Sequence, residues 1–153
     1  MTGIPLPVLV IGWAGLIPFI YGVLLVFLPE DANLPTFGLF APAREGGVVM
    51  LQNFGAVVLG FMGGCLWGFA SGTGRVPTFA LLLASAVPAL LAAVAIRSSP
   101  ALSCIWLAFG YVVLQGIDVT FQRAGVAPAY WLNLRLPLTA GVIACLLVGA
   151  LYG

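Results

Sequence analysis

Asp118 is the only ionisable residue inside the long apolar segments of this 153-residue chain. A carboxylate at the centre of a hydrocarbon layer costs about 2.5–3.5 kcal/mol on insertion scales, and less near the end of a span. Residues at intervals of three and four from Asp118 share its face of a helix. They form a stripe with a polar end: Cys104, Ala108, Tyr111, Gln115, Asp118 and Gln122. We expect this face to point into a helical bundle rather than toward lipid.

Two arginines are candidate partners for this carboxylate. If the spans alternate in direction, Arg123 and Arg135 lie on the side of the membrane where the Asp118 span ends. We predict a polar cluster at that end of the bundle, with an ion pair from Asp118 to Arg135 or Arg123. Its members are Trp67, Gln115, Asp118, Arg123 and Arg135. The cluster is either a structural tie between the last two spans or a pocket for a lipid, a quinone or another small hydrophobic ligand. A proton relay would need a second buried carboxylate or a His.

Composition excludes several classes of protein. Of all residues, 63% are hydrophobic, 6% are charged and none is His. A soluble domain of this size needs roughly a quarter of its residues charged, and a nucleic-acid-binding protein needs a basic patch. Because His is absent, and Cys65, Cys104 and Cys145 lie in three separate segments, we expect neither a metal site nor a cofactor. The sequence also contains no catalytic triad, P-loop or nucleotide-binding fingerprint, so we do not expect an enzyme.

The charge pattern predicts the fold. Eight of the nine charged residues lie outside five long apolar runs. Each run is close to the 20 or so residues that cross a hydrocarbon core, and a backbone in lipid satisfies its polar groups only as a helix or a closed barrel. We therefore predict an all-α bundle of five transmembrane helices with short loops, forming one domain over residues 1–153. The expected spans are 8–28, 46–70, 76–96, 101–121 and 136–152, with kinks at Pro18 and Pro88. The last span begins earlier, near Ala129, if Asn133 and Arg135 lie in the headgroup region.

Small residues indicate how the helices pack, because close backbone approach rather than hydrophobicity joins helices in lipid. The second span carries a glycine stripe spaced by four: Gly60, Gly64, Gly68 and Gly72. We interpret this stripe, widened by Gly63, as packing within the bundle. Contact with another subunit is the alternative. Tyr130 and Trp131 are predicted to anchor the last span at the membrane interface.

Several segments together resemble a known family. They are Leu16–Phe19, 54–64 with Trp67-Gly68, Ser85–Pro88, Gln115 with Asp118, 125–132 and 134–139. These segments resemble the domain-of-unknown-function 3429 family, and are similar to mitochondrial transmembrane protein sixty-nine. Members often carry Tyr or His at the positions of Phe54 and Leu66, so a His-dependent role cannot operate here.

The resemblance implies a small multi-pass protein of the bacterial inner membrane or, alternatively, the mitochondrial inner membrane. It assigns no activity. It does place Trp67, Asp118 and Arg135 on motif positions, which strengthens them as candidates.

We expect a non-enzymatic accessory or assembly subunit of a membrane protein complex. The partners would be the lipid bilayer and other membrane subunits, and not nucleic acid. The alternative is a binder or transporter of a lipid, quinone or other small hydrophobic ligand at the polar cluster. Five spans give no inverted repeat, which weakens the transporter interpretation.

Overall fold

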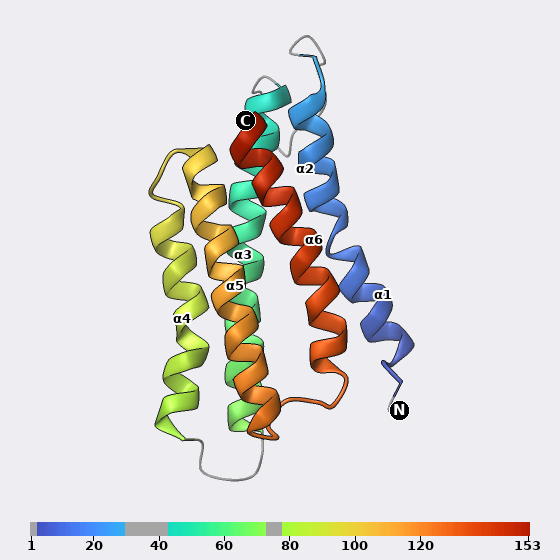
Figure 1. The fold of residues 1–153 in the computed structure, drawn as a ribbon, viewed down its shortest axis with the longest axis vertical. Helices are drawn as coiled ribbons and strands as arrows, with labels where there is room; N and C mark the ends of the chain where they lie inside the picture. Colours follow the sequence, from blue (N-terminus) through green and yellow to red (C-terminus); the bar gives the residue numbers. More distant parts are fainter. Residues whose placement is uncertain (1–2, 30–42, 73–77) are drawn as a thin grey trace.

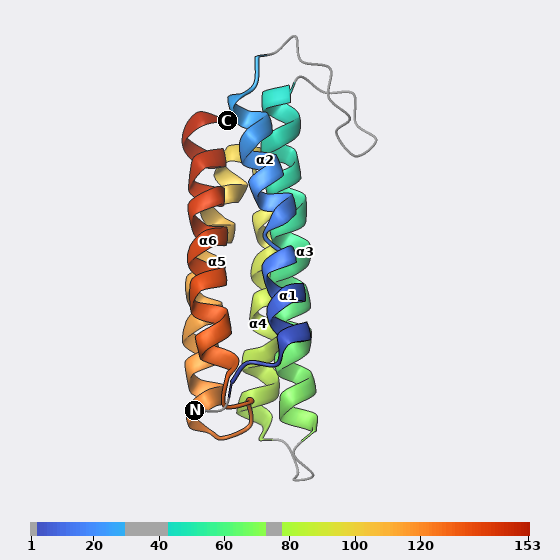
Figure 2. The same cartoon turned by 90° about the vertical axis from the view of Figure 1, so that its right-hand side faces the viewer.

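A computed structural model of the chain describes residues 3–29, 43–72 and 78–153, and every regular element in these ranges is a helix (Figures 1 and 2). The helices are α1 Leu6–Ala14, α2 Ile17–Phe27, α3 Ala43–Ser71, α4 Phe79–Ala95, α5 Pro100–Arg123 and α6 Trp131–Tyr152. The predicted all-α architecture is confirmed.

Within the described residues, four helical segments are long and apolar enough to cross a membrane, as in a multi-pass membrane protein. They are Leu6–Phe27, Arg44–Ser71, Pro100–Arg123 and Trp131–Tyr152. The third predicted span corresponds to α4, which is apolar but has only 17 residues. The last helix begins at Trp131 rather than at Leu136, so Arg135 lies within α6 and not before it.

The first span consists of two helices, because Pro18 interrupts it. Pro18 has no N–H to donate and its ring clashes with the carbonyl four residues earlier. Helix α1 therefore ends at Ala14, where the Gly15 N–H donates to the Ile11 carbonyl at 3.1 Å, and α2 starts at Ile17. Helix α4, in contrast, continues through Pro88 as one helix.

Helix α3 is central to the bundle and packs against α2, α4, α5 and α6. Two glycines permit its closest approaches. A Cβ added at Gly63 would lie 2.6 Å from the Ser85 carbonyl oxygen on α4, and one at Gly47 would lie 2.7 Å from the Gly22 carbonyl oxygen on α2. The absence of a side chain at these positions lets neighbouring backbones come together.

The glycine stripe that was predicted to pack within the bundle lies on the outer face of α3. An added Cβ at Gly60, Gly64 or Gly68 would have nothing within 4 Å, and one at Gly72 would meet only carbonyls of α3 itself. The prediction that this stripe packs within the bundle is therefore wrong. A spacing of four defines one face of a helix but not the neighbour of that face, and Gly63 belongs to the α4 side instead.

The two ends of the bundle carry different connections. The N-terminus and the turn from α5 to α6 lie at one end, whereas the C-terminus and the turn from α4 to α5 lie at the other (Figure 1). Asp118, near the end of α5, and Arg135, near the start of α6, consequently lie toward the end that holds the N-terminus.

Candidate functional site

An ion pair joins α5 to α6 inside the bundle. The Arg135 Nε lies 3.2 Å from the Asp118 Oδ2, and the two side chains are 6% and 0% exposed. Asp118 was predicted to pair with Arg135 or Arg123, and the partner is Arg135. Because the turn over residues 124–130 is short, the start of α6 lies beside the end of α5, which brings the two charges together.

Trp131 donates the second hydrogen bond to the Asp118 carboxylate. Its indole Nε1 donates a hydrogen bond to Asp118 Oδ1 at 2.7 Å. The indole ring packs edge-on against Phe69 of α3, with centroids 4.8 Å apart, and the Arg135 Cζ lies 5.8 Å from its centroid. Trp131 therefore links α3, α5 and α6. Its predicted role as an interfacial anchor is wrong, since only 9% of the residue is exposed.

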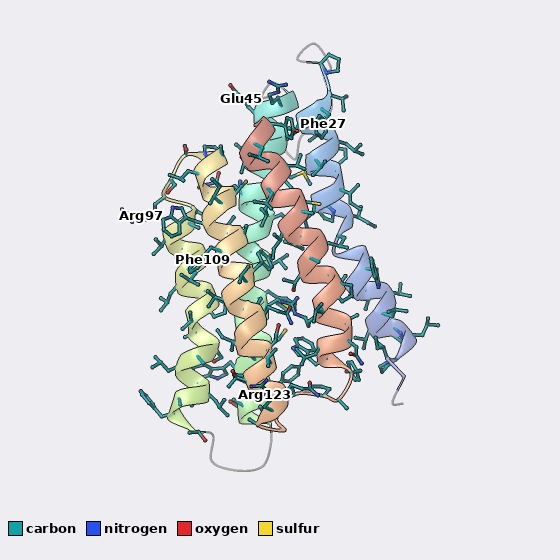
Figure 3. All side chains as sticks on the ribbon, viewed as in Figure 1. Phe27, Glu45, Arg97, Phe109 and Arg123 are labelled. Carbon is teal, nitrogen blue, oxygen red and sulfur yellow. The ribbon has the colours of Figure 1, made fainter. Side chains whose placement is uncertain are left out.

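Two of the predicted cluster members lie elsewhere. Trp67 is 50% exposed, because the fully buried Leu66 takes the inward position and the next residue lies about 100° further around the helix. Arg123 is exposed in the last turn of α5 (Figure 3), where its positive charge interacts favourably with the negative end of the helix dipole. The indole of the site is that of Trp131, not that of Trp67.

A second rung of polar groups lies one helical turn from the ion pair. Gln115 precedes Asp118 by three residues on α5, and Thr139 follows Arg135 by four residues on α6. Because α5 and α6 run antiparallel, both positions lie on the side away from the connecting turn, deeper in the membrane. We name Gln115, Asp118, Arg135 and Thr139 the interior polar site.

Several polar atoms of the interior polar site have no hydrogen-bond partner within the described ranges. They are Gln115 Oε1, Gln115 Nε2, Arg135 Nη2 and Thr139 Oγ1. A buried polar group left unpaired costs about 1–3 kcal/mol, so a merely structural tie would be better served by apolar residues at Gln115 and Thr139. The second rung is therefore the part of the site that an ion pair alone does not explain.

Helix α3 forms the third wall of the site. Cys65 lies near enough to Arg135 and Asp118 to interact electrostatically with both. One turn beyond Gln115, the Tyr111 hydroxyl donates to the Gly55 carbonyl of α3 at 3.0 Å. The site is thus enclosed by three helices rather than open to lipid on one side of a pair.

The arrangement limits the chemistry that the site supports. Both carboxylate oxygens of Asp118 accept hydrogen bonds, and its charge is matched by Arg135. Across residues 3–29, 43–72 and 78–153 no group of three His, Cys, Asp or Glu is placed to hold a metal ion. The Asp118 carboxylate is therefore held by two donors, both from α6.

A second polar cluster, near the opposite end of the bundle, was not predicted. The buried Gln52 of α3 donates through Nε2 to Ser103 Oγ at 3.1 Å and to the Ile96 carbonyl at 3.3 Å. The Ser103 hydroxyl in turn donates to the Ala95 carbonyl at 2.8 Å. The Ile96 carbonyl at the end of α4 thus accepts from Gln52, and the Ala95 carbonyl accepts from Ser103 as well as from the Ser98 N–H at 3.2 Å. A Gln inside an apolar run signals such a cluster, but its partner on α5 could not be identified from spacing.

Comparison with known proteins gives one match. The family described as "Protein of unknown function (DUF3429)" matches residues 4–151. No curated protein matches the chain, and no solved structure matches it.

Proposed function

The chain belongs to the DUF3429 family, and we propose that it is a non-enzymatic accessory subunit that joins a larger membrane complex through the outer face of α3. The observation that carries this proposal is the glycine stripe that the bundle leaves unused. Gly60, Gly64 and Gly68 are open to the surroundings over a distance of more than two helical turns.

Large apolar side chains lie on the same outer face of α3 as the stripe. On the same helix, Val57 is 67% exposed and Phe61 is 63% exposed. Small residues flanked by large ones allow a second helix to approach closely, and this packing is a main source of helix association in lipid. In soluble proteins an exposed glycine inside a helix is unfavourable, so three of them on one outer face favour a role beyond the chain's own fold.

Asn53 adds a polar group to the same face. It lies seven residues before Gly60 and is exposed, and no hydrogen bond joins its side chain to any described residue. It lies ten residues into a 29-residue helix, about 15 Å from the start of that helix. Hydrocarbon offers no hydrogen-bond partner, whereas Asn side chains in lipid commonly bond across to another helix.

A different protein, rather than a second copy of this chain, fits this face. Two copies crossing at Gly64 would bring the glycines together, but Asn53 lies eleven residues, roughly 16 Å, from that crossing point. At the crossing angle of about 40° typical of such glycine contacts, the two Asn53 side chains would diverge by roughly 10 Å. A helix of another protein, with its own polar group at the height of Asn53, can both pack on the glycine stripe and form a hydrogen bond with Asn53.

The interior polar site is consistent with a non-catalytic role. Each carboxylate oxygen of Asp118 already accepts a hydrogen bond, from Trp131 or from Arg135, and its charge is matched, which disfavours a role as general base or nucleophile. We place the complex in the bacterial inner membrane, with the mitochondrial inner membrane as the alternative. Both assignments rest on the resemblance of the segments described above.

The test places a large side chain on the glycine stripe without disturbing the packing of the bundle. Because a Cβ at Gly64 meets nothing within 4 Å, Gly64→Leu is expected to fold with an unchanged melting temperature. Tagged wild-type chain and the variant are extracted from native membranes with a mild detergent. We expect one membrane protein to copurify stoichiometrically with the wild type, and its yield to fall about tenfold with Gly64→Leu and with Asn53→Leu.

Gly116→Leu is the matched control, because Gly116 is also exposed, on α5, with nothing within 4 Å of an added Cβ. This variant should retain the partner. The proposal is wrong if Gly64→Leu retains the partner as well as Gly116→Leu does, or if the species lost with Gly64→Leu is a second copy of this chain.

A further inference from the structure

The interior polar site contains more hydrogen-bonding groups than its own residues use. Arg135 and Thr139 are only 5% and 4% exposed, yet Arg135 Nη2 and Thr139 Oγ1 have no partner within the described parts of the chain. The two side-chain amide atoms of Gln115, Oε1 and Nε2, also have no hydrogen-bond partner there. By their spacing, Gln115 shares a face of α5 with Asp118, and Thr139 shares a face of α6 with Arg135, each about one turn from the ion pair.

The charge of the site selects the kind of molecule it accepts. Asp118 and Arg135 neutralise each other, so the site carries no net charge. A bound anion or cation would bring an unmatched charge into a medium of low dielectric constant, because the charge of Asp118 is already matched by Arg135. Only an uncharged molecule avoids this penalty.

The unused groups are mainly donors. Arg135 Nη2 and Gln115 Nε2 only donate, Thr139 can donate or accept, and Gln115 Oε1 only accepts. A carbonyl oxygen only accepts, and it can bond to two of these three donors at a time. We propose that the interior polar site binds an uncharged, membrane-dissolved molecule by its carbonyl oxygen, with Arg135, Thr139 and Gln115 as the hydrogen-bonding residues. This site is separate from the outer face of α3 and does not depend on the proposed partner.

Two sources in a membrane supply such a carbonyl: a quinone ring and the ester of a neutral lipid. The test therefore uses decylubiquinone and dioctanoylglycerol as separate probes, with dioctanoyl phosphatidate as the charged comparison. Full-length chain in dodecyl maltoside is titrated with each probe, and affinity is obtained from the rise in melting temperature. Native mass spectrometry counts the bound molecules.

We expect at least one neutral probe to bind the wild type one to one, and to bind more tightly than phosphatidate. Thr139→Val and Gln115→Met keep the shape of each side chain and remove its hydrogen-bonding groups, so each should weaken binding about tenfold. Thr120→Val should bind as the wild type does, because the exposed Thr120 hydroxyl bonds only to the Gly116 carbonyl of its own helix. Binding of decylubiquinone alone assigns the site to quinones, and binding of dioctanoylglycerol alone assigns it to neutral lipids.

Both site variants remove unpaired buried groups, so without a probe their melting temperatures should equal or exceed that of the wild type. If one variant fails to fold, the other still reports on the site. The proposal is overturned if neither neutral probe binds the wild type, if both folded variants bind as tightly as the wild type, or if phosphatidate binds most tightly.

Discussion

The indole nitrogen of Trp131 lies 2.7 Å from the Asp118 Oδ1, so the first residue of α6 holds a carboxylate near the end of α5. Arg135 occupies the other carboxylate oxygen from the next turn of the same helix. Positions 131 and 135 therefore act together on Asp118, because residues four apart share one face of a helix.

Replacing Trp131 with Phe should destabilise the bundle. The aromatic packing on Phe69 is kept, but Asp118 loses a charge-assisted hydrogen bond, which costs about 2 kcal/mol. Unfolding free energies in mixed micelles measure this difference. Trp67→Phe is the control, and as an exposed position it should change stability by less than about 0.5 kcal/mol. Equal effects of the two changes would contradict the assigned role of Trp131.

Removing one member of the ion pair should be worse than removing both. Asp118→Ala leaves Arg135 as an unpaired buried charge, with an expected loss of about 3–5 kcal/mol and a low folded yield. The double variant Asp118→Leu with Arg135→Met replaces the pair by apolar side chains and should recover most of that loss. The wild type, Asp118→Leu, Arg135→Met and the double variant form a double-mutant cycle, and the four proteins are compared by unfolding in mixed micelles. Additive effects of the two single changes would show that the charges do not interact.

Neighbouring glycines of α3 should respond differently to the same substitution. A Cβ at Gly63 would come within 2.6 Å of the Ser85 carbonyl, so Gly63→Ala should separate α3 from α4 and cost about 1–3 kcal/mol. Gly64→Ala meets open space and should change stability by less than about 0.5 kcal/mol. Melting temperatures of the two variants are compared directly. A larger loss at Gly64 would mean that its face packs within the bundle after all.

Ser103→Ala should weaken the end of the bundle opposite the ion pair. The change removes one of two acceptors of the Gln52 amide and one of two donors to the Ala95 carbonyl, at a cost of about 0.5–1.5 kcal/mol. Thr120→Val, which removes an exposed hydroxyl, serves as the control. Hydrogen exchange of the last turn of α4 localises the effect. Unchanged protection of these amides would contradict the prediction that Ser103 stabilises the end of α4.

The fold was largely predictable because one physical term dominates it. Charges are excluded from hydrocarbon, so the gaps between apolar runs mark the ends of the helices. Errors arose where a charge did not mark an end. Arg135 was read as lying before the last span, whereas it lies inside α6, because its charge is matched by Asp118 and need not reach water.

The site was only partly predictable from the sequence. Alternation of the spans correctly brought Asp118 and Arg135 together. It also suggested Trp67, since that residue lies at the same height, but height does not determine which way a side chain points. The interval of four between Trp131 and Arg135 contained the missing information, because it places the two on one face of α6. Hydrogen bonds between helices, such as that of Gln52 with Ser103, depend on how each helix is rotated about its axis. The sequence of one apolar run does not determine that rotation.

The unequal lengths of α3 and α4 impose a demand on the surrounding bilayer. Helix α3 has 29 residues and spans about 43 Å, whereas its neighbour α4 has 17 residues and spans about 25 Å. A hydrocarbon layer of about 30 Å is exceeded by the first and not filled by the second. A short span is accommodated by local thinning of the bilayer, by snorkelling of its flanking residues or by contact with another protein, each at a cost that rises with the mismatch. A thinner host membrane would therefore suit the α4 side of the bundle better than a thicker one.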